Sequence, residues 1–361
     1  MDLILESYGT RISKRKGLLK ISTLDKDPVE VPLREVESII AGTGVQITSQ
    51  ALKALSSHAV NIVYTSLGKP YGLYTPFASV GTVFTRRQQI LAYEDKRGVH
   101  LASKFVYASI ENKRRLMLYF AKNRKRSNPT ETLYLKRVAN KLGEMIEKLE
   151  GFMETLTRDA TVYEIRRELM GIEGRSAAIY FREYGSLLPD EFITFKRSRR
   201  PPKDPANSLL SLGYTVLQGH ITTAIAAAGL ELYAGFLHSD RSGKPSLALD
   251  LLEEFRQPII DRFIAKLFHQ KRFSPDDFEE SIHGYRLKKR KKTFFYEQLK
   301  KEIQGGVTAQ ELFGKQKTKP VKTNNSKVNI NFKKQMVRQA RKLANYLIGA
   351  KSEYEPFLMN W

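Results

Sequence analysis

The spacing of apolar residues changes character once along the chain, near residue 84. Before that point, glycine, proline and charged residues separate short apolar or β-branched runs such as LILESYGTRIS, GLLKIS, VEVPL and SIIAGTG, a pattern typical of strands. A short helix is expected within ITSQALKALSS, where Ala51, Leu52 and Leu55 fall at helical spacing, and a buried strand NIVY, a GKP turn and a last strand follow. We therefore predict a compact β domain over residues 1–80.

From Phe84 onward, apolar residues recur every three or four positions, as in ASKFVYASIENKRRLMLYF and LYLKRVANKLGEMIEKL, which indicates amphipathic helices. No strand signal of comparable strength returns. The chain has 361 residues, 41% of them apolar, and can bury two cores, because single cores stop growing at roughly 250–300 residues. We expect a linker at residues 81–95 and an α-helical domain at residues 96–361, which makes the fold class α+β.

The chain is strongly basic. Lysine and arginine number 61 against 38 acidic residues, a formal net charge of +23. Such a surface repels itself unless an anionic partner lies against it, so nucleic acid is the leading candidate partner. A membrane surface, or solubility alone, would also account for the charge.

Two absences narrow the function classes. The sequence contains no cysteine, which excludes a disulfide framework, a thiolate zinc site and a cysteine nucleophile. No apolar run approaches the ~20 residues of a membrane span, and the opening MDLILESYG lacks the features of a signal peptide. We expect a cytoplasmic protein that does not enter a membrane.

Two basic segments interrupt the helical pattern. FKRSRRPPKDPAN at residues 195–207 and KQKTKPVKTNNSKVN at 315–329 are rich in proline or polar residues, and both are predicted to be flexible cationic loops. The run RLKKRKK at 286–292 is also basic. The sequence assigns no specific role to 286–292 or to 315–329.

The segment GFLHSDRSGKPSLALDLLEEFRQPIIDRF, residues 235–263, combines an apolar stripe with a cluster of acids. Leu247, Leu251 and Phe255 indicate the buried side of a helix that begins near Pro245, and Pro258 should kink or restart that helix.

Asp250 and Glu253 are three residues apart, so their carboxylates should project from neighbouring turns on one side, whereas Glu254 should point nearer to solvent. His238 precedes them, and the polar SDRSGK between could turn the chain so that a histidine ending one helix faces the carboxylates of the next. The simpler explanations are a structural histidine and a solvated acidic face.

A third acidic residue lies well before that segment. Glu173 stands in ELMGIEGRSAAIYF between two glycines, which would let a backbone or a phosphate come close. The alternative is a short turn that opens a helix with an acidic residue. Tyr180 and Tyr214 could contact phosphate or act as nucleophiles, but core rings with satisfied hydroxyls are the favoured interpretation.

Three blocks carry a family resemblance, and they lie in order across residues 171–357: GIEGRSAAIYF, the stretch RRPPKDPAN through QPIIDR, and QARKLANYLIGAKSEYEPF. Together with ITSQALKAL and TRRQQ nearer the N-terminus, they resemble the CRISPR-associated spacer-acquisition integrase, the Cas1 family. The resemblance implies a β-sandwich-like N-terminal domain and an α-helical catalytic C-terminal domain. It also implies a homodimer, two of which clamp a dimer of the small Cas2 protein in a hetero-hexamer.

The resemblance further implies a divalent metal held by Glu173, His238 and Glu253, with Asp250 as a further catalytic residue beside it. Two carboxylates and one imidazole are a donor set suited to Mg²⁺ or Mn²⁺. Arg256 corresponds to a basic position that faces the nucleic acid. The candidate DNA-binding residues near the site are Arg175, Arg197, Arg199, Arg200, Lys203, Lys244 and Arg256.

The implied activity is that of a metal-dependent DNA integrase and endonuclease. It joins the 3′-hydroxyl ends of short DNA fragments to a CRISPR repeat by transesterification of double-stranded DNA. Two alternatives stay open: a non-catalytic nucleic-acid scaffold whose acids pair with nearby arginines, and a free-standing metal-dependent nuclease.

Overall fold

The computed structural model describes residues 2–5, 7–24, 27–66, 69–77, 83–157, 159–193, 197–198, 201–282, 284–304 and 331–361. The basic segment predicted at 315–329, together with Arg199 and Arg200, lies outside these ranges. Within them, no helix combines the length and the apolar content that crossing a bilayer requires.

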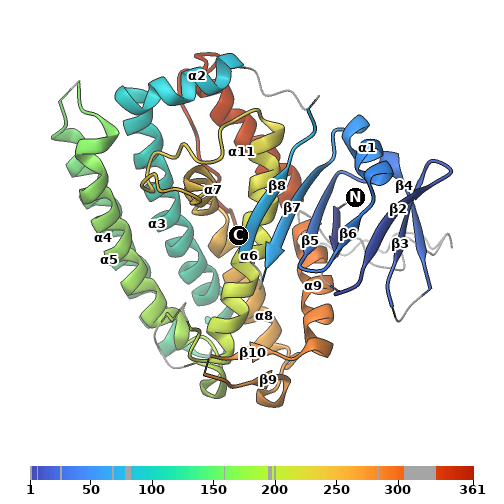
Figure 1. Ribbon diagram of the computed structural model, residues 1–361. Coiled ribbons are helices and arrows are strands. Elements are labelled where there is room, and N and C mark those ends of the chain that lie inside the picture. Colours follow the sequence, from blue (N-terminus) through green and yellow to red (C-terminus); the bar gives the residue numbers. More distant parts are fainter. Residues whose placement is uncertain are drawn as a thin grey trace, which may run out of the picture.

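The N-terminal region contains two small four-stranded sheets (Figure 1). The first has the order β1-β5-β7-β8, in which β8 alone runs antiparallel to its neighbour. The second has the order β4-β3-β2-β6 and is built on two antiparallel pairings. The strands are β1 (Asp2–Leu5), β2 (Arg11–Arg15), β3 (Leu18–Ser22), β4 (Val29–Pro32), β5 (Ser38–Gly42), β6 (Gln46–Ile47), β7 (Asn61–Ser66) and β8 (Lys69–Tyr74).

The burial of each strand follows its place in these sheets. All five residues of β5, SIIAG, are buried, as expected of a parallel strand covered on both faces. Buried and half-buried residues alternate in β3. The predicted short helix is α1 (Ser49–Ser57); the Thr48 side chain caps it by accepting the N–H of Ala51 at 3.3 Å.

The remainder is largely helical, so the predicted α+β class is confirmed. Two short strands, β9 (Phe278–Glu279) and β10 (Arg286–Leu287), form a separate antiparallel pair. The described α-helices are α2 (Val83–Leu91), α3 (Lys96–Arg124), α4 (Pro129–Glu154), α5 (Val162–Gly185), α6 (Pro205–Ala227), α7 (Ser246–Leu252), α8 (Arg262–His269), α9 (Lys289–Gln304) and α11 (Phe332–Leu347).

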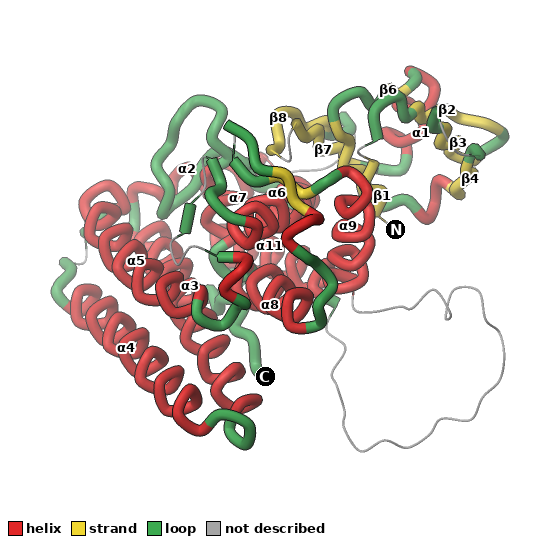
Figure 2. The backbone as a smooth tube through the Cα atoms, turned by 90° about the horizontal axis from the view of Figure 1, so that it is seen from below, coloured by secondary structure: helices red, strands yellow, loops and turns green. Residues whose placement is uncertain are grey.

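The long helices α3, α4 and α5 pack side by side, as Figures 1 and 2 show from two directions. Their starts carry side-chain caps: the Asp95 carboxylate accepts the N–H of Arg97 at 2.8 Å, and the Asn128 side chain accepts that of Glu131 at 3.0 Å. Because α3 also contacts α7, it reaches the segment that carries the acidic cluster.

Two hydrophobic cores form, one among the N-terminal sheets and α1 and one among the helices. The first sheet packs on α6, where a Cβ at Gly219 would lie 3.1 Å from Ile40 Cδ1. Residues 81–95, where a linker is predicted, contain α2. Its buried Gln89 donates to the carbonyls of Glu231 at 2.9 Å and Ala234 at 2.7 Å. This contact anchors the loop that leads to His238.

Candidate active site

Glu173 lies in the middle of α5, so the alternative of a short turn that opens a helix is wrong. The position of Gly174 beside it faces open space, since a Cβ there would meet no atom within 4 Å. The Glu173 carboxylate accepts a hydrogen bond from Lys113 Nζ at 2.9 Å, and Lys113 is almost fully buried on α3. A buried ammonium therefore lies against this acid.

That ammonium decides the ionisation of Glu173. Burial alone would raise the pKa of Glu173, but the charge and hydrogen bond of Lys113, with smaller contributions from Arg256 and His238, outweigh burial and lower the pKa to about 2. Glu173 is therefore a carboxylate at neutral pH, ready to accept a cation.

Glu253 follows the last residue of α7 and points at the same part of α3. Its Oε2 accepts the Ser109 hydroxyl at 2.9 Å, and its Oε1 pairs with Arg256 Nη1 at 2.8 Å. The Ser109 oxygen also lies 3.5 Å from Glu173 Oε1 and accepts a hydrogen bond from Lys113 at 2.8 Å. One turn of α3 thus brings together two acids that are 80 residues apart in the sequence.

Asp250 is fully buried and makes different contacts from Glu253. Its carboxylate accepts the backbone N–H groups of Phe236 at 2.6 Å, Leu237 at 3.0 Å and His238 at 2.9 Å. It also lies 2.7 Å from His238 Nδ1, which assigns the ring proton to Nδ1 and leaves the Nε2 lone pair available. Asp250 therefore orients the imidazole.

His238 lies in a loop and does not end a helix as predicted, because α6 has already stopped at Ala227. The close approach of this loop to α7 depends on Gly235. A Cβ there would lie 2.7 Å from Ser246 Cβ and 2.8 Å from Asp250 Oδ2. A side chain at position 235 would push the loop away from Asp250.

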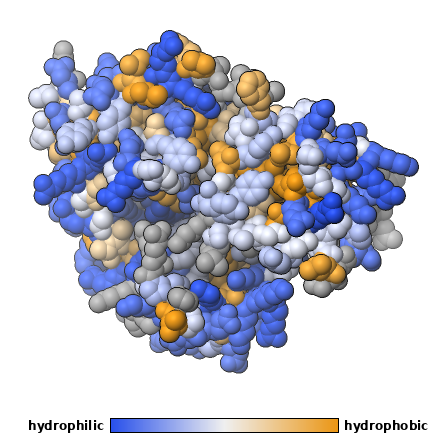
Figure 3. Space-filling model, viewed as in Figure 1, coloured by the Kyte–Doolittle hydropathy of each residue, from blue (hydrophilic) through white to orange (hydrophobic). Residues whose placement is uncertain are grey.

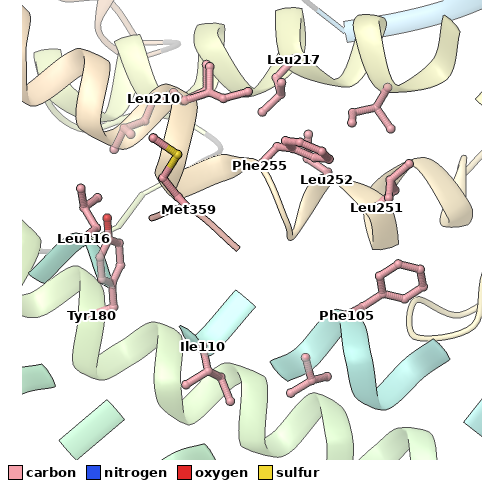
Figure 4. Packing of buried hydrophobic residues seen from close by; sticks show 14 of the residues in the cluster. Phe105, Ile110, Leu116, Tyr180, Leu210, Leu217, Leu251, Leu252, Phe255 and Met359 are labelled. Atoms are coloured by element: carbon pink, nitrogen blue, oxygen red, sulfur yellow. The ribbon is translucent and has the colours of Figure 1, made fainter. Parts of the chain in front are cut away.

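The helix of the acidic cluster begins at Ser246, after Pro245, as predicted. This helix, α7, contacts both α6 and α3. Figure 4 shows Leu251 and Phe255 between side chains from the two neighbouring helices. The chain then changes to a π-helical turn, η4 (Arg256–Asp261), which contains Pro258. The predicted kink or restart is confirmed, since proline cannot supply the N–H that a continuous helix needs.

Arg256 is held on both sides. Besides its pair with Glu253, its guanidinium lies over the ring of Tyr214, 5.4 Å from the centroid, and Arg197 lies over the same ring at 5.6 Å. The Tyr214 hydroxyl donates to Asp261, as does that of Tyr180 at 2.7 Å. Burial raises the pKa of both tyrosines well above the usual value, which favours core rings over nucleophiles.

Glu254 is completely buried, so its predicted position near solvent is wrong. Its carboxylate accepts the N–H of Phe357 at 2.7 Å, the Gln339 amide at 2.9 Å and the Tyr354 hydroxyl. Asn112 of α3 donates to the carbonyls of both Glu254 and Phe357 at 2.9 Å. The C-terminal segment therefore ties α3 to the residue beside Glu253.

Sequence reasoning missed the residues on α3 that surround this site, Ser109, Asn112 and Lys113. One signal could have found Lys113: it falls three residues after Ile110 and three before Leu116, on the apolar stripe of the helix. A lysine is rarely buried without a partner, so that position predicts a buried acid nearby.

The candidate DNA-binding residues differ in how far they are exposed to solvent. Arg175 is exposed on α5 and pairs with Glu168 at 3.0 Å, Lys203 is exposed, and Lys244 is half-buried. Arg197 and Arg256 both lie over the ring of Tyr214, and Arg256 also pairs with Glu253. Arg199 and Arg200 are outside the described part of the chain.

Among the described residues, no three His, Asp or Glu side chains lie in metal-ligating geometry. Instead, Lys113 pairs with Glu173 and Arg256 with Glu253. The donor set nevertheless fits a hard divalent ion. The half-buried Glu173 and the buried Glu253 face the same hydroxyl, and one imidazole is held with Nε2 available.

Comparisons with known proteins identify relatives of this chain. The family model for CRISPR associated protein Cas1 matches residues 3–301. A CRISPR-associated endonuclease Cas1 of Thermus thermophilus is 33% identical over 355 residues, which cover 96% of this chain and 93% of that protein. A Cas1 endonuclease of Archaeoglobus fulgidus is 32% identical over 286 residues, covering 78% and 81%.

Two solved structures share the fold. A CAS1 protein from Thermotoga maritima matches with a TM-score of 0.75 at 23% identity, over 100% of both chains. A chain of a Cas6-RT-Cas1–Cas2 complex matches with a TM-score of 0.76 at 22% identity. That match covers 100% of the present chain and 36% of the chain in the complex.

Proposed function

Because the chain belongs to the Cas1 family, the endonuclease and integrase family of CRISPR adaptation, we propose that Glu173, His238 and Glu253 bind Mg²⁺ or Mn²⁺ at its DNA-joining site. One observation carries the proposal. Ser109 lies within 3.5 Å of a carboxylate oxygen of both Glu173, from α5, and Glu253, from the end of α7. Bringing two carboxylates together at a largely buried position is unfavourable unless cations compensate them.

When bound, the divalent ion would polarise a phosphodiester and stabilise the charge that develops on the leaving oxygen. The chain supplies alignment. Asp250 holds His238 in one tautomer, and Lys113 holds Oε1 of Glu173. Within the described part of the chain, no hydrogen bond reaches the other oxygen of Glu173. Arg256, fixed over Tyr214, places positive charge beside Glu253.

The reaction that suits this arrangement is transesterification. The 3′-hydroxyl of a short DNA fragment attacks a phosphodiester at the end of a CRISPR repeat, one P–O bond forms as another breaks, and the proton passes to the leaving oxygen. Because the number of phosphodiester bonds is unchanged, the step needs no ATP.

The scaffold alternative has support of its own, since Glu173 and Glu253 pair with Lys113 and Arg256. A strand-transfer assay separates the two: fragment DNA, a repeat-containing plasmid and Mn²⁺, with wild type beside Glu173→Gln. We expect the variant to lose most of the product and to keep its DNA affinity. Glu168→Gln, on an exposed position of α5, is the matched control. Equal product from wild type and Glu173→Gln would favour the scaffold.

We also propose a cytoplasmic homodimer that joins Cas2 in a hetero-hexamer on double-stranded DNA. The edge strand β8 supports self-association, because it exposes Tyr71 and Leu73, and Figure 3 shows apolar side chains gathered over this part of the surface. Light scattering with and without Cas2 tests the assembly. Integration that stays equally unspecific after Cas2 is added would favour a free-standing nuclease.

A further inference from the structure

A cavity of about 890 Å³ lies away from the candidate active site. One side of α11 forms one wall. The other lining residues are Lys351, Ser352, Glu353, Glu355 and, from the N-terminal region, Glu37. Figure 1 places α11, in red, beside α6. We call this cavity the α11 groove.

Three cations follow the α11 groove along one side of the helix. Lys334, Arg338 and Arg341 are all exposed, at steps of four and three residues. None of them makes an ion pair within the part of the chain that the structure describes. The neighbours that do pair are Lys333, 2.7 Å from Glu37, and Lys342, 3.5 Å from Glu355.

The stability of the helix does not explain this stripe. α11 contains five basic residues and no acidic one, and two of the basic residues stand in its first turn, where positive charge opposes the helix dipole. Like charges at i,i+4, as at Lys334 and Arg338, cost a few tenths of a kcal/mol each. Because these charges destabilise the helix locally, their presence is better explained by an anionic ligand that binds them.

The chemistry of the α11 groove favours a polyanion over a folded protein. Of the described residues that line it, Val337 alone has an aliphatic side chain, and it is half-buried. Protein interfaces usually have an apolar or aromatic centre, which this groove lacks. Unpaired guanidinium and ammonium groups in a row suit the phosphates of nucleic acid.

We propose that the α11 groove binds the phosphate backbone of duplex DNA outside the reacting phosphodiester. The same helix reaches the candidate site from its other face, because the Gln339 amide donates to Glu254 at 2.9 Å, next to Glu253. DNA held in the groove is therefore held by an element that also packs against the site. The inference rests on the proposed function in one respect, namely that the ligand is DNA.

The test removes the three charges together. Fluorescence anisotropy measures the affinity for a 40-base-pair duplex at several salt concentrations, and log affinity is plotted against log salt. In Lys334→Gln/Arg338→Gln/Arg341→Gln, the magnitude of this slope should fall by about 2.7, since each lost phosphate contact accounts for ~0.9. The control Lys136→Gln/Arg137→Gln/Lys141→Gln removes three exposed charges from α4, and its slope should match wild type. Circular dichroism melts confirm that both fold.

Three results would overturn the inference: an unchanged slope in the α11 variant, equal losses in both triple variants, or loss of Cas2 binding with DNA binding intact. The last would make the groove a protein interface. The Glu173→Gln protein separates this inference from the proposed function, because it should keep the full salt slope while losing strand transfer. Absence of strand transfer in wild type would count against the function alone.

Discussion

Lys113 supplies the charge balance of the candidate site. Its buried ammonium contacts Glu173 directly and reaches Glu253 through the Ser109 hydroxyl. In a medium of low dielectric constant, such a group compensates acids that would otherwise repel each other. Lys113 and Arg256 thus compensate the negative charge of Glu173 and Glu253.

Replacing Lys113 with methionine should lower the free energy of unfolding by about 3 kcal/mol, because it leaves a buried carboxylate without a partner. Mg²⁺ or Mn²⁺ should restore more stability to this variant than to wild type, since the ion then replaces the lost charge. Urea unfolding with metal and with EDTA measures both effects. Lys122→Met, exposed on the same helix, is the control. Equal stability of Lys113→Met and wild type in EDTA would contradict this account.

Glu254 predicts a dependence of stability on pH. Burial raises its pKa from 4.5 to about 7, despite three hydrogen-bond donors that lower it. Between pH 4.5 and 7 the unfolded chain has released this proton and the folded chain has kept it, so stability falls as pH rises.

The free energy of unfolding of wild type, minus that of Glu254→Gln, should therefore decrease by up to about 3 kcal/mol from pH 4.5 to 7. The amide can retain the hydrogen bonds but cannot ionise. Parallel urea titrations at several pH values give the difference. A difference that is constant with pH would show that Glu254 titrates as an ordinary exposed acid.

At the scale of elements, α5 and the π-helical turn after α7 carry unusual helix features beside the candidate site. α5 carries Gly171 and Gly174 on either side of Glu173, although glycine weakens helices. The π-helical turn brings Arg256 back toward Glu253 in place of a regular helix. α5 remains a continuous helix despite these glycines. A π-helical turn, in contrast, interrupts the regular helix, which is typical of functional positions.

Gly174→Ala should raise the free energy of unfolding by about 0.5–1 kcal/mol, because alanine favours the helix and nothing lies within 4 Å of the added methyl. If the open face receives a phosphate, strand transfer should weaken in the same variant. Thermal melts and strand-transfer rates measured together test this. Gly235→Ala, whose methyl would meet Asp250 and Ser246, should instead lose stability. A Gly174→Ala protein with unchanged strand transfer would place the DNA elsewhere.

At the scale of the whole molecule, the positive charge is concentrated in the helical part. Residues 1–80 contain nine basic and seven acidic side chains, so residues 81–361 contain 52 and 31. The contact of the first sheet with α6 therefore joins a nearly neutral region to a strongly basic one. The basic region also carries the candidate site and the α11 groove.

Because net charge repels itself, the melting temperature of the free protein should rise by a few degrees between 50 and 500 mM NaCl. Heparin at 50 mM NaCl should produce a similar rise by binding the basic surface. Differential scanning calorimetry measures both. A melting temperature that falls with salt would show that attractive ion pairs dominate the balance.

The sequence by itself determined the α+β class, the short helix α1, the start of α7 and its buried stripe, because these depend on local spacing of apolar residues and on proline. Its motif blocks also singled out Glu173, His238 and Glu253 as candidate metal ligands, and that assignment stays a prediction. The core role of Tyr180 and Tyr214 was likewise predictable from their chemistry. The sequence did not indicate that Asp261 accepts the hydrogen bonds of both hydroxyls.

The tertiary structure alone decided which groups meet. Glu254 is buried by a segment about 100 residues later, His238 stands in a loop held by Asp250, and Lys113 meets Glu173 across 60 residues. Periodicity cannot predict these contacts. Helical spacing indicates on which side of a helix a residue lies, but not which distant segment of the chain packs against that side. The segment that packs against each acid also determines its charge, since burial and neighbouring cations set the pKa of the acid.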